Sequence, residues 1–244
     1  MGDGVAQIER GYATIAVPGC AARADRVLFL GGSFDPVHMG HVGLALSAAR
    51  AWGGDEAWVV FVPAARSPHK DREPTADRHR LEMLRLALRG RRRWWIWDQE
   101  LRDAGLNPGE PSYWADTWAI AKQTFGGGDG RAFLIGTDQA LSMHRWRRSN
   151  EFWRDALVMR RGDGSDDDFA GALRGTGAWS EADIGHWMSR VVDVPVMDVS
   201  STAIREGLSA RENARGEGPV RQAVDGLDPG VFRYIAERGL YRDG

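Results

Sequence analysis

Residues 27–41 read VLFLGGSFDPVHMGH, and this stretch decides the fold class. Its first four residues are apolar and end in a glycine pair, which is typical of a buried strand that stops at a turn. From Met39 to Trp52 the apolar spacing becomes helical. The stretch therefore predicts a strand, a glycine-containing turn and a helix in direct succession, and open α/β sheets bind ligands at such turns.

The alternation of short apolar runs and helical spacing continues downstream. Further strands are predicted at residues 56–62, 94–97, 132–135, 156–159 and 194–197, and further helices at 75–88, 112–124, from 201 onward and at 229–238. Because the strands are continuous apolar runs, both faces of the sheet should be covered. We predict one Rossmann-like α/β domain over residues 27–244, a doubly wound parallel sheet with a C-terminal helical extension. The Gly- and Asp-rich residues 162–177 are predicted to form a mobile surface loop.

The bulk composition limits the class of partner. A chain of 244 residues, 43% of them hydrophobic, can bury one sizeable core. The net charge of −2 gives no reason to expect a nucleic-acid binder. No apolar run approaches the roughly 20 residues that span a membrane, so no membrane partner is expected. The oligomeric state is left open.

The N-terminal residues 1–26 are interpreted as an extension that need not be ordered. Within them, Val17-Pro18-Gly19-Cys20 loosely resembles a lipoprotein cleavage site. The apolar stretch before it, from Ala13 to Val17, is shorter than the ~7–15 residues of a secretory core. Cys20 is also the single cysteine, which excludes an internal disulfide and fits a reducing compartment. We therefore expect a cytoplasmic protein.

Two histidines stand at the start of the first predicted helix. His38 lies just before it and His41 in its first turn, so both imidazoles can donate to an anion beside the free N–H groups of the helix start. Gly31 and Gly32 let the backbone approach a phosphate closely or adopt positive φ. A metal site would need a third ligand, and no H-E-x-x-H or comparable spacing is present. The pattern favours phosphate binding.

A second pattern of the same kind lies near the other end of the chain. Ser200, Ser201 and Thr202 open a predicted helix, in which Ser201 is expected to be the cap, and Arg205 follows one turn later. Hydroxyls and free N–H groups at a helix start bind anions, and arginine adds a bidentate phosphate donor. On its own, this pattern is equally typical of a plain cap beside a solvated arginine.

Together the two patterns resemble the nucleotidyltransferase superfamily of the (H/T)xGH type. Residues 31–41 match the extended G-G-(S/T)-F-D-P-x-H-x-G-H form that is typical of nicotinate mononucleotide adenylyltransferases. Residues 199–205 are similar to that family's I-S-S-T-x-I-R, and residues 235–241 resemble its closing Y-I-x-x-x-G-L-Y. The resemblance spans residues 27–242.

The resemblance implies that ATP phosphates are held from two sides. His38 and His41 contact them on one side, and Ser201, Thr202 and Arg205 on the other, with His38, His41 and Arg205 as the catalytic set. The implied ATP site further comprises Gly31, Gly32, Ser33, Phe34, Gly40, Lys70, Gly136, Asp138 and Ser200. No dedicated carboxylate cage is visible in the sequence, so we expect Mg²⁺ held mainly by the ATP phosphates and no protein metal site.

The middle of the chain carries the implied acceptor site. Residues 112–117, SYWADT, resemble the family's S-Y-T-x-D-T, and Trp146 matches a tryptophan that stacks on the nicotinate ring. At Trp114 the family has a threonine that helps to recognise the pyridine nucleotide, and tryptophan is far larger and cannot accept a hydrogen bond. The implied pyridine-nucleotide residues are Ser33, Phe34, Lys70, Tyr113, Trp114, Thr117 and Trp146.

The activity that the resemblance implies is adenylyl transfer from ATP to nicotinate mononucleotide, giving deamido-NAD and pyrophosphate. Transfer to nicotinamide mononucleotide stays open because of Trp114. Phosphopantetheine adenylyl transfer is a weaker match, since that family is typically shorter and has a T-x-G-H form. The alternative from a different class is a non-catalytic nucleotide sensor with the same fold.

Overall fold

A computed structural model describes residues 17–65, 73–107, 110–161, 164–195, 197–213 and 226–242. Within these ranges, strands join into one parallel sheet in the order β3-β2-β1-β4-β5-β6. The strands are β1 (Val27–Gly32), β2 (Trp58–Pro63), β3 (Trp94–Ile96), β4 (Arg131–Gly136), β5 (Ala156–Arg161) and β6 (Val191–Val194). The chain proceeds outward from β1 to β3 and then returns to β4 on the other side of β1, so the strand order reverses between β1 and β4.

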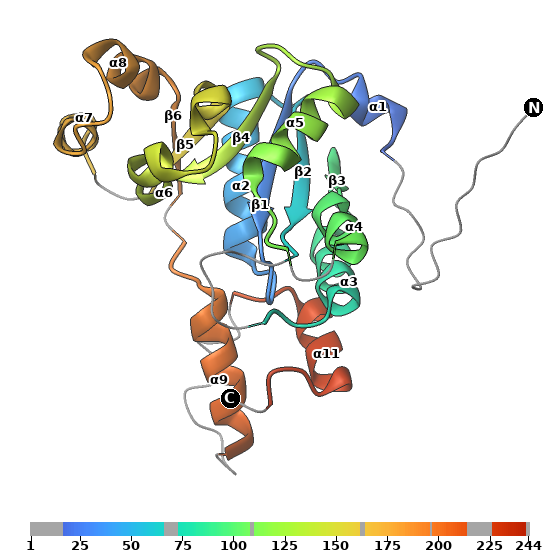
Figure 1. Ribbon diagram of the computed structural model, residues 1–244. Helices are drawn as coiled ribbons and strands as arrows, with labels where there is room; N and C mark the ends of the chain where they lie inside the picture. Colours follow the sequence, from blue (N-terminus) through green and yellow to red (C-terminus); the bar gives the residue numbers. More distant parts are fainter. Residues whose placement is uncertain are drawn as a thin grey trace, which may run out of the picture.

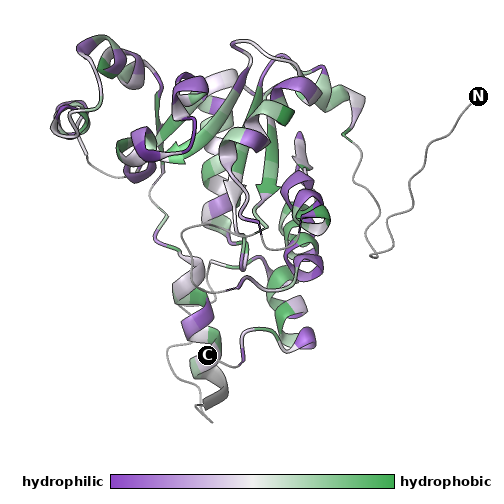
Figure 2. Cartoon of the chain, viewed as in Figure 1, coloured by the Kyte–Doolittle hydropathy of each residue, from purple (hydrophilic) through white to green (hydrophobic). Residues whose placement is uncertain are grey.

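Helices cover both faces of this sheet (Figure 1). α2 (Met39–Gly53) and α3 (Asp77–Leu88) share a core with Leu28 and Leu30, whereas α5 (Trp114–Phe125) shares one with Val27 and Phe29. Successive residues of β1 thus enter opposite cores, and Figure 2 shows the strands as predominantly hydrophobic. The predicted Rossmann-like, doubly wound sheet is confirmed, and its two covered faces explain the continuous apolar runs.

The predicted C-terminal helical extension consists of α9 (Ser201–Asn213) and α11 (Pro229–Arg238). In Figure 1 both helices lie at the end of the molecule toward which β1 and β2 point. Ile204 of α9 and Val231 and Ile235 of α11 are buried in the same core as α2 and α3. The extension is therefore packed onto the sheet domain at the edge where the phosphate motifs meet.

The prediction of a surface loop over residues 162–177 is wrong, because most of this segment forms α7 (Asp166–Gly175). Ser165 caps the helix, with its Oγ accepting from the backbone N–H of Asp168 at 3.1 Å. Three aspartates in the first turn complement the helix dipole, and Leu173 is fully buried. Capping and one apolar stripe outweigh the high Gly and Asp content.

Other boundaries also differ from the sequence prediction. The helices α4 (Gln99–Leu106) and α8 (Glu181–Ser189) were not predicted. β6 ends at Val194, before Pro195, whose ring removes a backbone donor from any continuing strand. Short helical turns connect β4 to β5, namely α6 (Thr137–Ser142), η1 (Met143–Arg145), η2 (Ser149–Glu151) and η3 (Trp153–Asp155).

The folded part begins upstream of the expected start at residue 27. The short helix α1 (Gly19–Ala22) buries Ala21, and Arg131 Nη2 donates to the carbonyl of Ala22 at 3.2 Å. Residues 1–16 lie outside the described residues. In the part of the chain that the structure describes, none of the helices combines the length and the apolar character needed to cross a membrane.

Candidate active site

The first phosphate motif connects the C-terminal end of β1 to the first turn of α2. It lies where the strand order reverses, which is the position at which open α/β sheets bind ligands. The backbone N–H of Met39, the first residue of α2, donates to the carbonyl of Gly226 at 2.7 Å. The helix start is thereby tied to the segment that leads into α11.

The two histidines of this motif pack against each other. His38 is the N-cap of α2 and is 6% exposed, and His41 lies in the first turn. Their ring centroids are 3.7 Å apart, and the backbone N–H of His38 donates to Nδ1 of His41 at 3.3 Å. Because Nδ1 accepts this bond, a neutral His41 ring carries its proton on Nε2.

Phe34, a predicted nucleotide-site residue, directs its ring into the core. Its φ is 50°, and its ring is 1% exposed and packs edge-on against His41 and Phe61, with centroid distances of 5.1 and 5.9 Å. The ring therefore supports His41, and the nucleotide contact expected at Phe34 stays a prediction. The left-handed turn falls at Phe34, and neither Gly31 nor Gly32 has a positive φ.

Two glycines of the motif are needed for space. A Cβ on Gly31 would lie 2.9 Å from Cζ3 of Trp114, closer than real Cβ contacts come. A Cβ on Gly40 would lie 2.9 Å from Nδ1 of His38. The absence of a side chain thus allows one ring to pack on β1 and another to pack on the start of α2.

The second motif forms the start of α9 and packs onto the first. The cap is Ser200 and not Ser201 as predicted, since Ser200 Oγ accepts from the backbone N–H of Ala203 at 3.1 Å. Ser201 Oγ instead donates to the carbonyl of Pro36 at 2.9 Å. One hydroxyl therefore stabilises the helix, and the next joins it to the loop that precedes His38.

Arg205 braces the same loop. Its Nη1 donates to the carbonyl of Asp35 at 2.7 Å, and its Nη2 donates to Thr202 Oγ1 at 3.1 Å. Arg205 is not among the residues that line the pocket described next. The structure thus gives Arg205 a contact within the protein, and its catalytic role stays a prediction.

A pocket of about 280 Å³ opens between the two motifs. Its polar lining comes from the starts of α2 and α9, and its floor is formed by apolar residues of β1, β4, β5 and α2. The residues that line it are Leu30, His38, Gly40, His41, Leu44, Ala45, Leu134, Met159, Val199, Ser200, Ser201 and Thr202. Two helix N-termini, two imidazoles and three hydroxyls converge on one space, which is an arrangement suited to a polyphosphate.

A second, smaller pocket of about 140 Å³ lies between α4 and the start of α5. It brings together Tyr113 and Thr117, two of the predicted acceptor-site residues. The residues that line it are Glu100, Asp103, Ala104, Asn107, Glu110, Pro111, Ser112, Tyr113, Asp116 and Thr117.

Glu100 is a functional candidate in this pocket that the sequence did not assign. Thr117 Oγ1 donates to Glu100 Oε1 at 2.9 Å, and both residues are buried. Burial raises the pKa of the Glu100 carboxyl to about 7, although the hydrogen bond from Thr117 opposes the rise. Thr117 therefore positions a buried carboxyl that changes charge near neutral pH.

The two predicted tryptophans are half-buried and pack against the core on the α5 side of the sheet. Trp114 lies parallel to Trp118, with ring centroids 6.2 Å apart, and Trp146 packs against the same apolar cluster. Neither residue lines the pockets described above. Sequence reasoning also missed Arg147, whose guanidinium lies 4.6 Å from the centroid of the Tyr113 ring.

Gly136 and Asp138, two further predicted ATP-site residues, lie where β4 meets α6. Gly136 ends β4 and caps α6, and a Cβ there would lie 2.5 Å from Oδ1 of Asp138, which is exposed in the first turn. The two residues thus lie beside the C-terminal end of β1, because β4 pairs with β1 in parallel. Lys70 lies outside the described residues.

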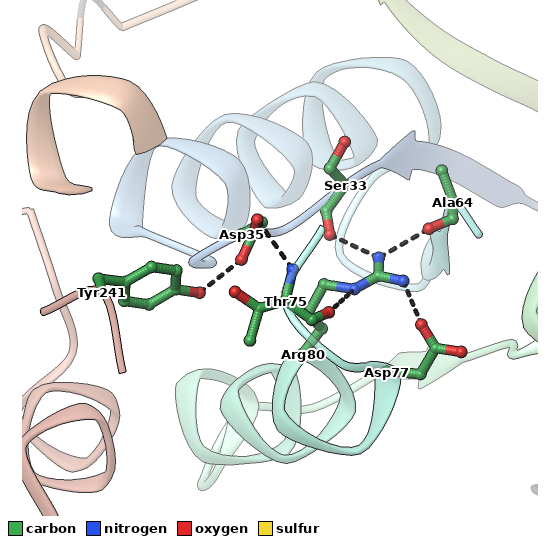
Figure 3. A network of polar contacts seen from close by, with 7 residues as sticks. All are labelled: Ser33, Asp35, Ala64, Thr75, Asp77, Arg80 and Tyr241. Atoms are coloured by element: carbon green, nitrogen blue, oxygen red, sulfur yellow. Dashed lines mark hydrogen bonds and ion pairs between the residues drawn. The ribbon is translucent and has the colours of Figure 1, made fainter. Parts of the chain in front are cut away.

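A buried arginine, Arg80, binds the loop of residues 33–38 that leads to His38, here called the phosphate loop. The sequence did not indicate this contact. Arg80 of α3 has no exposed surface, and its guanidinium donates to the carbonyls of Ser33, Ala64 and Thr75 and to Oδ1 of Asp77, over 2.6–2.9 Å (Figure 3). The signal in the sequence was Asp77, which stands one helical turn before Arg80 and can pair with it.

Comparison with known proteins decides the family. A family model described as cytidylyltransferase-like matches residues 29–207. A Neisseria meningitidis serogroup C protein named "Probable nicotinate-nucleotide adenylyltransferase" is 31% identical over 219 residues, which cover 88% of this chain and 98% of that protein. The chain belongs to this family of nicotinate-nucleotide adenylyltransferases.

Further relatives agree with this family. A Symbiobacterium thermophilum protein of the same name is 34% identical over 226 residues, covering 90% of this chain and 96% of its own length. The structure of Plasmodium falciparum nicotinic acid mononucleotide adenylyltransferase complexed with NaAD has a TM-score of 0.59 at 15% identity, over 88% of this chain and 97% of that one. The sequence resemblance and the enzyme class, a nucleotidyltransferase of the nicotinate-nucleotide adenylyltransferase family, are thus confirmed.

Proposed function

We propose that this protein transfers the adenylyl group of ATP to nicotinate mononucleotide, giving deamido-NAD and pyrophosphate for NAD biosynthesis. The observation that carries the proposal is the pocket between the two motifs, where His38 and His41 face Ser200, Ser201 and Thr202. Such a set of donors suits a triphosphate.

The chemistry needs no protein nucleophile. A 5′-phosphate oxygen of the mononucleotide attacks the α-phosphorus of ATP in line, a new P–O bond forms, and the bond to the β-phosphate bridging oxygen breaks. The attacking phosphate is already ionised at neutral pH, so catalysis rests on positioning and on stabilising the charge of the departing pyrophosphate. Nε2–H of His41 and the N–H groups at the starts of α2 and α9 are the donors that we assign to that charge.

Arg205 belongs to the same assignment. A guanidinium has five N–H donors, and contacts with Asp35 and Thr202 engage two of its nitrogens. Thr202, to which Nη2 donates, lines the pocket, so the guanidinium lies next to a pocket residue. We propose that Arg205 braces the loop and binds phosphate at the same time.

Mg²⁺ is proposed to arrive with ATP. The part of the chain that the structure describes contains no group of three or more His, Cys, Asp or Glu side chains that could hold a metal ion. Mg²⁺ usually keeps several waters and binds through substrate phosphates, and bound there it would neutralise triphosphate charge. Hydrogen bonds from the protein would then add to the charge neutralisation that the ion provides.

The acceptor is proposed from the family and from the second pocket. The relatives described above carry nicotinate in their names, and Tyr113, with Arg147 over its ring, lines a pocket of its own. We propose that Tyr113 and Thr117 contact the pyridine nucleotide in this pocket, and that Trp114 and Trp146 support the site from the adjoining apolar cluster. A cytoplasmic location is also proposed, because a single cysteine fits a reducing compartment.

An acceptor panel tests the function. The purified protein is incubated with ATP, Mg²⁺ and, in turn, nicotinate mononucleotide, nicotinamide mononucleotide and phosphopantetheine, and both pyrophosphate and the coupled product are measured. The proposal expects the highest kcat/KM with nicotinate mononucleotide. An equal or higher value with the amide would assign the protein to nicotinamide mononucleotide, and ATP binding without any product would favour a nucleotide sensor.

A further inference from the structure

The carboxylate of Asp35 connects the phosphate loop to two distant parts of the chain. Asp35 is 5% exposed, although it lies on the loop that leads to His38. Its Oδ2 accepts from the backbone N–H of Thr75 at 3.2 Å, and its Oδ1 accepts from the hydroxyl of Tyr241 at 2.6 Å (Figure 3). A carboxylate buried this deeply requires such donors, so both contacts constrain where the loop can lie.

The backbone of the same loop is bound residue by residue. The carbonyl of Ser33 accepts from Arg80, that of Asp35 from Arg205, and that of Pro36 from Ser201. These three contacts are made to backbone carbonyls of the loop. Tyr241 instead contacts the side chain of a loop residue, Asp35. Three elements that are separated in the sequence, namely α3, α9 and the C-terminal segment with Tyr241, therefore fix the turn that leads to both histidines.

Tyr241 is itself held in place. It follows Gly239, the left-handed C-cap of α11, and is 8% exposed. Its carbonyl accepts from Ser209 Oγ of α9 at 3.0 Å. Burial, together with the negative charge of Asp35, raises the pKa of the Tyr241 hydroxyl, so this group stays protonated and remains a donor over the physiological pH range.

We propose that Tyr241 is a positioning residue for adenylyl transfer: through Asp35 it fixes the 33–38 turn so that His38 and His41 face the start of α9 across the pocket. Tyr241 does not line this pocket, so it acts on the loop and not on the substrate. The inference rests on the proposed function and adds to it a residue near the end of the chain.

Tyr234 provides a matched control. It lies on α11, and its hydroxyl is 2.8 Å from Nδ1 of His79, with no contact to the phosphate loop among the residues described. Tyr234→Phe deletes a half-buried hydrogen bond to an imidazole, which typically costs about 0.5–1.5 kcal/mol of stability. Tyr241→Phe deletes a bond to a buried carboxylate, which typically costs about 1.5–3 kcal/mol. A purely structural role would therefore lower Tm in both variants and leave kcat and the Kd for ATP of the folded proteins unchanged.

The test compares the full-length wild-type protein with Tyr241→Phe and Tyr234→Phe. Three quantities are measured: kcat and KM in the acceptor assay, the Kd for ATP by calorimetry, and Tm. For Tyr241→Phe we expect kcat to fall about tenfold, because displaced catalytic groups lose transition-state contacts, and the Kd for ATP to rise several-fold. Tyr234→Phe should leave kcat and Kd within twofold of wild type, with a smaller decrease in Tm.

The result that would overturn the inference is a Tyr241→Phe protein with kcat and ATP Kd both within twofold of wild type, or an equal loss in Tyr234→Phe. If wild type forms no product with any acceptor, the proposed function fails, and the Kd for ATP alone then decides the inference. If Tyr241→Phe does not fold, Asp35→Asn replaces it. The backbone N–H of Thr75 needs the single amide oxygen, so Nδ2 faces Tyr241 and the charged acceptor of the Tyr241 hydroxyl is lost. An unchanged kcat and Kd would equally refute the positioning role.

Discussion

The backbone N–H of His38 donates to Nδ1 of His41 over 3.3 Å, so each histidine of the motif determines the geometry of the other. The cap residue anchors the first-turn ring, and that ring carries its proton on Nε2 when neutral. Both residues line the pocket between α2 and α9. The contact therefore orients His41 so that its neutral ring can donate through Nε2–H.

His41→Ala is expected to lower kcat by about 10²–10³-fold, the cost of removing one preorganised donor to a developing negative charge. Stability should change by less than about 2 kcal/mol, because the ring lies at the rim of the core and not inside it. Steady-state kinetics and urea unfolding measure the two effects. His186→Ala, a histidine of α8 that does not line the pocket, is the control and should keep its full kcat. Near-normal turnover in His41→Ala would rule out its phosphate role.

Arg80→Met is expected to destabilise the protein by about 3 kcal/mol, since it leaves the half-buried carbonyls of Ser33, Ala64 and Thr75 and the Asp77 carboxylate without their donor. Arg80→Lys should recover little, because an ammonium cannot reproduce the planar fork. Chemical denaturation gives the free energy of unfolding. On the same helix, Arg85 forms only an exposed ion pair with Glu82, so Arg85→Met should cost about 1 kcal/mol or less. A loss no larger than that in Arg80→Met would contradict the loop-holding role.

Glu100 should make stability depend on pH. Its pKa is about 7 in the folded state against an ordinary value of 4.5, so between these values the folded state binds more protons than the unfolded state. The free energy of unfolding then decreases as pH rises through this range, by on the order of 3 kcal/mol. Glu100→Gln should make the free energy of unfolding less dependent on pH over this range, even if the substitution also changes stability by a constant amount at every pH. Glu110→Gln, an exposed residue that lines the same pocket, should keep the wild-type slope. Equal slopes in wild type and Glu100→Gln would show that the carboxyl is not buried in solution.

Gly31→Ala tests the packing of Trp114 on β1. The added methyl would lie 2.9 Å from Cζ3 of the indole, so the ring must move. We expect KM for the mononucleotide to rise about tenfold, with a smaller change in KM for ATP. Combining it with Trp114→Thr should restore much of the loss, since the smaller side chain removes the clash. Gly185→Ala, where a methyl meets nothing within 4 Å, is the control. Failure of the double variant to recover would mean that Gly31 is needed for another reason.

The sequence predicted what depends on local pattern. The strand, glycine turn and helix over residues 27–41 follow from the apolar spacing, and the meeting of Ser200–Thr202 with His38 and His41 was anticipated from the family resemblance. The direction in which a side chain points was not readable. Phe34, which the resemblance places in the nucleotide site, enters the core because the left-handed turn at that residue directs its ring against His41.

Long-range contacts account for most of what was missed. Arg80 looks like a surface residue of an amphipathic helix until its carbonyl partners are known, of which Ser33 and Ala64 are distant in the sequence. Tyr241 and Asp35 are 206 residues apart, and no local spacing predicts their bond. α7 was missed for the opposite reason: its signals are local, namely the Ser165 cap and the acidic first turn, but its Gly and Asp content suggested a loop.

The most direct test of the central claim is a crystal structure of the protein with Mg²⁺ and a non-hydrolysable ATP analogue. The account predicts triphosphate oxygens within about 3.2 Å of His41 Nε2 and of donors at the start of α9, around Ser201 and Thr202. The two motifs would then hold one ligand between them. A triphosphate bound outside this pocket, with His41 and Thr202 both beyond hydrogen-bond distance of it, would contradict the account.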